Sequence, residues 1–101
     1  MILTTTNSVE NYKIIEYKGI VSGTAVMAEK TTLSFNMEKY YAAISESIAE
    51  VKSAAFMQLK ENAEKINANA VVGINIDIEI KNNDYIIIVS ATGTAVNIVN
   101  K

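Results

Sequence analysis

Two carboxylates, Asp77 and Glu79, are the residues with the clearest capacity for chemistry, and they lie in the stretch VVGINIDIEI. They are two positions apart in an alternating apolar and polar pattern, so they share one face of a predicted β-strand. Neighbouring carboxylates offer oxygen ligands to a hard divalent cation, but calcium prefers six to eight oxygens and magnesium an octahedron. Asp77 and Glu79 therefore form a candidate metal site that ligands from other subunits would complete. The alternative is that both are ordinary polar residues of the surface or of a contact between subunits.

The composition of the chain excludes several other chemistries. It has no cysteine and no histidine, whereas zinc, copper(I) and similar metals prefer thiolate or imidazole ligands. Serine, threonine and lysine therefore have no partner for a nucleophilic relay, and no glycine-rich phosphate-binding loop is present. We expect a protein that is not an enzyme and that holds no cofactor other than a divalent metal.

The length indicates one small domain, covering residues 1–101, and its formal net charge is −2. All nine basic residues are lysine, and they do not cluster as phosphate contacts require, so we expect no nucleic-acid partner. The start, MILTTTNS, lacks the pattern of a secretory signal. The longest apolar run is far shorter than the roughly 20 residues that cross a bilayer. We expect a cytoplasmic protein with no membrane partner.

Two long elements precede the acidic stretch. Residues 12–28 alternate as a strand does, and Gly19 and Gly23 within it indicate a bulge or a close approach of backbones. Residues 37–66 predict a helix that ends at Asn67 or Ala68, because asparagine tolerates the left-handed conformation. One apolar stripe follows the helical period and consists of Ile44, Ile48, Val51, Ala55, Leu59, Ala63 and Ile66.

Phe56 and Met57 do not fit this stripe. Phe56 lies at its border and Met57 lies among charged residues. Either they cover the margin of the core or they contact a second subunit, and both interpretations remain open.

The last two strands are predicted to form a hairpin with a turn at Asn82 and Asn83. A turn centred there places apolar residues opposite one another on the face that the helix should cover. The predicted pairs are Ile80 with Tyr85, Ile78 with Ile87, Ile76 with Val89 and Ile74 with Ala91.

The opposite face of the hairpin is mixed. The same register sets Glu79 against Ile86 and Asp77 against Ile88, which gives neither a dry core nor a well-solvated surface. Ile86 and Ile88, together with Phe56 and Met57, are therefore candidate residues of an oligomer interface.

Four segments of the chain resemble the YbjQ family, also called UPF0145 or DUF74. They are ILTTTN, GIVSGTAV, NANAVVGINIDIE and SATGTAV, and the resemblance covers nearly the whole sequence. It implies a two-layer β-α-β-β domain similar to a dodecin subunit, assembled as a ring-like homopentamer, and the family label refers to heavy-metal binding. We therefore expect an α+β fold with one long helix on a mainly antiparallel sheet. The expected function is a non-enzymatic homo-oligomeric module of unknown ligand, with carboxylate binding of a divalent metal at subunit interfaces as the alternative.

Overall fold

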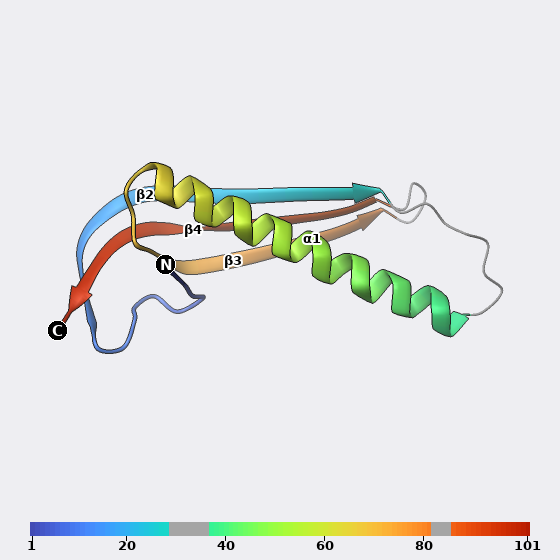
Figure 1. Cartoon of the computed structure of the whole chain (residues 1–101), viewed down its shortest axis with the longest axis horizontal. Coiled ribbons are helices and arrows are strands. Elements are labelled where there is room, and N and C mark those ends of the chain that lie inside the picture. The colour runs from blue at the N-terminus through green and yellow to red at the C-terminus, as the bar shows by residue number, and fades with distance from the viewer. Residues whose placement is uncertain (29–36, 82–85) are drawn as a thin grey trace.

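The computed structural model describes residues 1–28, 37–81 and 86–101, and for residues 37–43 the backbone only. One helix packs on a mainly antiparallel sheet with strand order β1-β3-β4-β2, and α1 runs diagonally along one face of that sheet (Figure 1). The predicted α+β architecture is confirmed, and β1 is a short strand that the sequence did not predict. The predicted turn residues Asn82 and Asn83, with Tyr85, lie outside the described residues. The elements are β1 (Ile2–Leu3), β2 (Tyr12–Ala28), α1 (Met37–Lys65), β3 (Ala70–Lys81) and β4 (Ile86–Asn100).

The two glycines of β2 have the two roles that the sequence allowed. Gly19 has φ +120°, and the register with β4 shifts between Tyr17 and Gly19, so this glycine belongs to a bulge. Gly23 lies directly beneath α1. A Cβ atom there would collide with the carbonyl oxygen of Ala55 and lie 2.5 Å from the backbone nitrogen of Leu59. The helix backbone therefore comes very close to β2.

The end of α1 follows from Asn67, whose φ is 63°. Its N–H donates to the carbonyl of Glu64 at 3.0 Å, and the N–H of Ala68 donates to the carbonyl of Ala63 at 3.1 Å. These two bonds form a Schellman motif, which satisfies carbonyls that the last turn would otherwise leave free. The predicted helix end is confirmed.

The predicted register of the hairpin was wrong by two residues. The described pair nearest the connection is Lys81 with Ile86, where the predicted register would set Ile80 against Tyr85. A shift of two residues keeps each side chain on its predicted face and changes only its partner. The observed pairs are Ile80 with Ile87, Glu79 with Ile88, Ile78 with Val89, Asp77 with Ser90 and Ile76 with Ala91.

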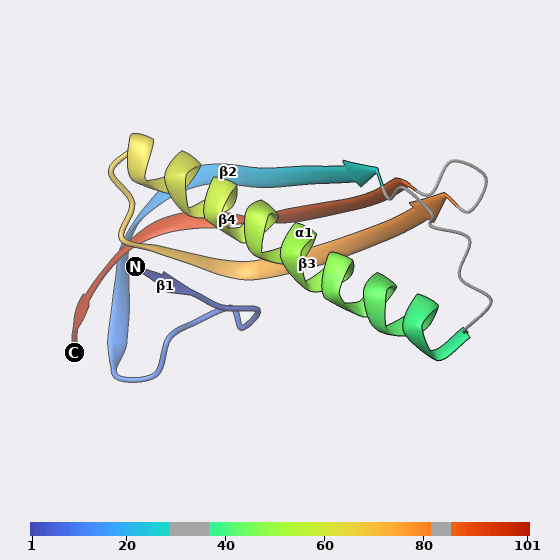
Figure 2. The same ribbon diagram turned by 45° about the vertical axis from the view of Figure 1, so that its right-hand side comes forward.

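The N-terminal segment extends the sheet beside β3. β1 pairs in parallel with the start of β3, and the next residues continue along it (Figure 2). The carbonyls of Thr6 and Thr4 accept the N–H groups of Gly73 at 2.8 Å and of Ile74 at 3.1 Å. Gly73 has φ +61° and lies where the register with β4 shifts between Val72 and Asn75. Its left-handed conformation makes this bulge, a conformation that glycine adopts without steric cost.

Apolar cores lie on both faces of the sheet. On the helix face, two clusters join α1 to β2, β3 and β4; their buried members include Leu59, Val21, Ile74 and Ala91 in one, and Val51, Ala55, Ile87 and Val89 in the other. On the opposite face, near the end of β4, a third cluster of Ala70, Val72, Val96 and Ile98 is covered by Ile2, Val9, Tyr12 and Ile14. Among the residues that the structure describes, none packs over the middle of that opposite face in this way. The residues of this middle part are Ser22, Thr24, Asn75, Asp77, Ser90 and Thr92.

Candidate functional site

A row of three partly exposed isoleucines on β3 stands out on the described surface of the chain. Ile76, Ile78 and Ile80 are 37%, 41% and 44% exposed. Their neighbours across the sheet, Ile87 and Val89, are almost fully buried on the same face. Sequence analysis predicted that α1 covers this whole face. That is correct for Ile74, which is buried, but incomplete for the isoleucine row, the name that we use for Ile76, Ile78 and Ile80.

The position of α1 explains why the isoleucine row is uncovered. The helix packs mainly on β2 and β4 and touches β3 little. At the level of Leu59 the facing residue of β2 is Gly23, so the helix can approach there, whereas β3 presents bulky isoleucines along its helix face. Because α1 packs closely on β2, where Gly23 is small, it leaves the bulky isoleucines of β3 partly exposed.

The described residues also leave the outer backbone edge of β3 unpaired along this row. Within the described residues, no strand lies on the outer side of β3 beyond Ile74. The N–H of Ile74 points outward, to Thr4, and strand alternation directs the N–H and C=O groups of Ile76, Ile78 and Ile80 the same way. We call this edge, residues 75–81, the β3 margin. It combines an unpaired ladder with exposed apolar side chains, the combination that invites pairing with another chain.

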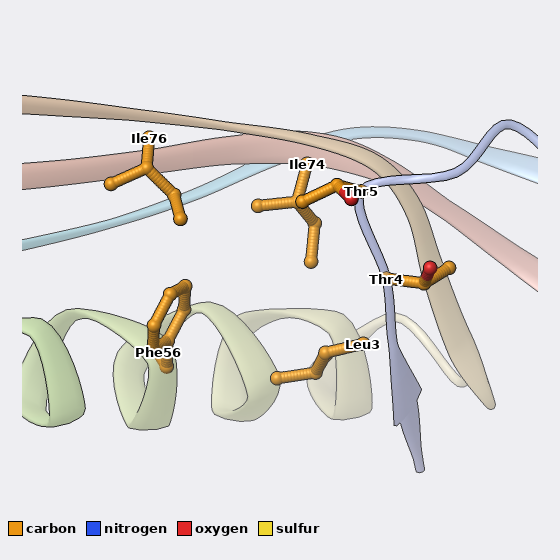
Figure 3. A pocket seen from close by; sticks show the side chains of 6 residues that line it. All are labelled: Leu3, Thr4, Thr5, Phe56, Ile74 and Ile76. Atoms are coloured by element: carbon orange, nitrogen blue, oxygen red, sulfur yellow. The ribbon is translucent and has the colours of Figure 1, made fainter.

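A pocket of about 270 Å³ continues the isoleucine row toward the N-terminal segment. Phe56 points from α1 toward Ile76, and Thr4 and Thr5 close the other end (Figure 3). Its walls are mostly apolar. The lining residues are Leu3, Thr4, Thr5, Phe56, Ile74 and Ile76.

The four predicted interface residues fall in three places. Phe56 is half-buried, packs on the core and lines this pocket. Met57 is 61% exposed on α1 and does not line the pocket. Ile86 and Ile88 are half-buried on the face opposite α1, at the far end from the third apolar cluster. The structure thus connects only Phe56 with the isoleucine row, which sequence analysis did not single out as exposed.

The other edge of the sheet, β2, is partly closed by α1. The backbone N–H of Thr24 donates to Oε1 of Gln58 at 2.5 Å, and Nδ2 of Asn62 donates to the carbonyl of Ser22 at 2.7 Å. On either side of these two bonds the strand carries exposed Ile20 (82%) and Val26 (62%). We call residues 20–26 of this edge the β2 margin.

The predicted metal ligands, Asp77 and Glu79, both lie exposed on the face opposite α1. Asp77 pairs across the sheet with Ser90 of β4, which pairs in turn with Thr24 of β2. Glu79 pairs in the same way with Ile88 and, beyond it, Val26. Among the residues that the structure describes, nowhere do three or more Asp, Glu, His or Cys side chains group together to hold a metal ion. With no thiolate or imidazole in the sequence, the residues of this chain do not fit a soft heavy metal.

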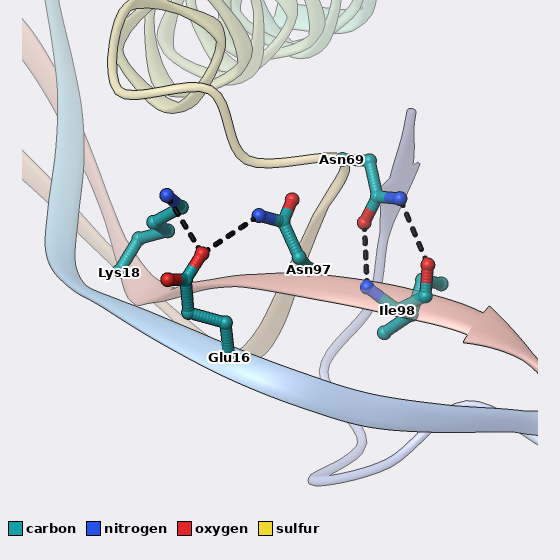
Figure 4. A network of polar contacts seen from close by, with 5 residues as sticks. All are labelled: Glu16, Lys18, Asn69, Asn97 and Ile98. Carbon is teal, nitrogen blue, oxygen red and sulfur yellow. Dashed lines mark hydrogen bonds and ion pairs between the residues drawn. The ribbon is translucent and has the colours of Figure 1, made fainter.

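A separate polar network lies at the register shifts of β2, between Ile14 and Gly19 (Figure 4). Nζ of Lys18 lies 2.7 Å from Oε1 of Glu16, and Nδ2 of Asn97 donates to the same oxygen at 3.1 Å. The hydrogen bond from Lys18, followed by that from Asn97, lowers the pKa of the Glu16 carboxyl below 4.5. Nearby, the side-chain amide of Asn69 exchanges two hydrogen bonds with the backbone of Ile98, at 2.8 and 2.9 Å.

In the described part of the chain, the hydropathy of α1 is too low for a segment that crosses a bilayer. Its apolar side instead packs on the sheet, as in a helix of a two-layer domain.

The fold and this site define a class: small α+β domains with one helix on a mainly antiparallel sheet and, among the described residues, an unpaired margin of β3. A family model described as "Putative heavy-metal-binding" matches residues 1–99. The chain belongs to this family, known as UPF0145 or DUF74, as the resemblance of its motifs implied.

Two relatives agree with this assignment. A UPF0145 protein of Acetivibrio thermocellus is 34% identical over 103 residues, covering 95% of this chain and 97% of that protein. The crystal structure of a DUF74-family protein of unknown function from Pediococcus pentosaceus has a TM-score of 0.71 to this chain. It is 22% identical and 98% of each chain is covered, so it supports the fold.

Proposed function

We propose that this protein is a non-enzymatic module that works as a homo-oligomer assembled through the β3 margin. One observation carries the proposal: three isoleucines, 37% to 44% exposed, lie beside an unpaired strand edge. Monomeric proteins usually avoid this arrangement, because it promotes pairing between chains. The resemblance to the YbjQ family supports five subunits as the number.

The free energy gained by burying the isoleucine row can be compared with the cost of bringing two chains together. Completing the burial of three isoleucines that are about 40% exposed stabilises a complex by roughly 2–4 kcal/mol. Association costs about 4–15 kcal/mol in lost translational and rotational freedom. The row alone is therefore insufficient, and the partner must also supply a backbone ladder and further contacts.

Native mass spectrometry and light scattering at micromolar concentration test the assembly. We expect a five-subunit species for the wild type and mainly monomer for Ile78→Lys, because the lysine would have to be buried at the contact. Val99→Lys is the matched control, since Val99 is 42% exposed against 41% for Ile78 and lies in the inner strand β4. A monomeric wild type, or equal loss of assembly in both variants, would contradict the proposal.

A second candidate is the binding of a hard divalent cation through Asp77 and Glu79. It is supported by their common position on the face opposite α1, exposed and two residues apart on one strand. Two carboxylates are too few for calcium or magnesium, so the ligand set would need neighbouring subunits or water. Isothermal calorimetry with calcium, magnesium and zinc tests it. We expect any calcium binding to be lost in Asp77→Asn/Glu79→Gln, and zinc binding tighter than calcium would argue against this ligand set.

A further inference from the structure

The pocket between Phe56 and Ile76 has the size and the walls of a site for a small apolar ligand. Its volume is about 270 Å³, and its apolar lining consists of Leu3, Phe56, Ile74 and Ile76. A cavity of about 150 Å³ with walls of leucine, isoleucine and phenylalanine is large enough to bind benzene. The space beside Phe56 therefore admits a larger ligand, of two fused rings.

The walls of this pocket are held in place by the rest of the fold. Ile74 is buried, and Leu3 and Phe56 pack against the same apolar cluster. The N–H of Thr4 donates to the carbonyl of Val71 at 3.0 Å, and the carbonyl of Thr4 accepts the N–H of Ile74 at 3.1 Å. A pocket that is formed before its ligand arrives loses little conformational freedom on binding, which favours affinity.

The two threonines at the end of the pocket differ in what their hydroxyls can do. The Thr6 hydroxyl donates to the carbonyl of Ser8 at 2.6 Å, so the 2.8 Å contact between Thr4 and Thr6 uses the proton of Thr4. Oγ1 of Thr4 also accepts the N–H of Thr6 at 3.1 Å. The side chain of Thr5 points instead toward Ile74 (Figure 3), and within the described part of the chain it has no hydrogen-bond partner. Its hydroxyl is available to a ligand.

Charge narrows the class of ligand. Within the described part of the chain, no charged side chain lines the pocket. A ligand with a carboxylate or a phosphate against these walls would lose hydration without gaining an ion pair. A neutral aromatic ring gains apolar contact and a favourable arrangement against the Phe56 ring. A single N–H or O–H on such a ring can donate to the Thr5 hydroxyl, which accepts as well as donates.

We propose that this pocket binds a neutral, planar molecule of two fused aromatic rings that carries one N–H or O–H group, of the size of indole. The rings lie between Phe56 and Ile76, and the polar group donates to Oγ1 of Thr5. A few polar groups among mainly apolar walls are the usual composition of a small-molecule site. All the lining residues belong to one chain, so the inference does not depend on the homo-oligomer proposed above.

A titration with indole, followed by NMR of isoleucine methyl groups, tests the site. We expect indole to shift the δ1 methyl signals of Ile74 and Ile76 with a dissociation constant below about 1 mM. The signal of Ile98, which lies in the cluster on the opposite face of the sheet, should not move. Indole-3-carboxylate should bind about tenfold more weakly. The absence of shifts, equal shifts at Ile98, or equal affinity for the carboxylate would overturn the proposal.

Two matched comparisons locate the ligand. Phe56→Leu should raise the dissociation constant of indole about fivefold, whereas Met57→Leu, at the next and exposed position of α1, should leave it unchanged. Thr5→Val should raise it roughly threefold to tenfold, and should not change the affinity for 1-methylindole, which has no N–H to donate. Equal effects within either comparison would overturn the proposal. Circular dichroism checks folding, and Thr5 is exposed, so its comparison stands even if Phe56→Leu does not fold.

Discussion

Asn69 extends the sheet by one position without belonging to a strand. Its amide accepts from the N–H of Ile98 and donates to the carbonyl of Ile98, as the peptide group of a neighbouring strand would. Nothing in the local sequence predicts this role, because the partner lies 29 residues away along the chain. Asp77 and Glu79 contrast with it. Their alternation places them on one face of a strand, and the structure agrees. Sequence could not tell that, within the described residues, no third ligand side chain lies beside them, because that depends on three-dimensional neighbours.

Glu16 gives a prediction at the scale of one residue. Lys18 and Asn97 lower the pKa of its carboxyl in the folded state. The stability that this carboxylate contributes is therefore present above pH 4.5 and is lost as the pH falls through the lowered pKa. We expect Lys18→Met to raise the pKa of Glu16 toward 4.5, followed by NMR of the side-chain carboxyl carbon. Lys13→Met, on the same strand, should leave it unchanged, and equal shifts in both variants would argue against a specific Lys18 bond.

At the scale of elements, the periodicity of apolar residues predicts the structure better than the local signals for turns and bulges do. The helix, its stripe and its end at Asn67 follow from residue spacing and from the tolerance of asparagine for positive φ. The hairpin register does not, because it depends on where the connection is centred, and the described pairs are offset by two residues from the predicted ones. β1 is equally hard to predict, since a strand of two residues has no period and is held by Ala70 and Val71.

The approach of α1 to β2 gives a prediction at this scale. Gly23→Ala places a methyl group against the carbonyl of Ala55, and neither backbone can move without disturbing the core. We expect a loss of about 1–3 kcal/mol in the free energy of unfolding, as for other overpacked sites, measured by urea denaturation. Ser22→Ala, one position earlier and exposed, is the control and should change it little. An unchanged Gly23→Ala would mean that the helix approaches less closely than described.

At the scale of the whole molecule, the uncovered isoleucine row is the main departure from the sequence prediction. Alternation correctly assigns Ile76, Ile78 and Ile80 to the helix face. It cannot say how far the helix extends across that face, because this depends on Gly23 letting α1 settle beside β2. Of the candidate interface residues, only Phe56 adjoins the row. All four, Phe56, Met57, Ile86 and Ile88, remain predictions as interface residues.

Assembly through the β3 margin also predicts a concentration-dependent melting temperature. A folded state held by subunit contacts gains stability from mass action. We expect the midpoint of thermal unfolding of the wild type to rise with protein concentration in differential scanning fluorimetry. Val99→Lys should show the same slope, and Ile78→Lys should show none. A flat wild-type profile would indicate that folding and association are not linked.

The side chains of Gln58 and Asn62 bear on how the exposed β2 edge behaves in solution. An unpaired strand edge pairs readily with extended polypeptides nearby. Here the carbonyl of Ser22 and the N–H of Thr24 are already bonded to the side-chain amides of Asn62 and Gln58. An incoming strand must displace both amides before it can pair, so the two side chains lower the tendency of this edge to recruit other chains and aggregate.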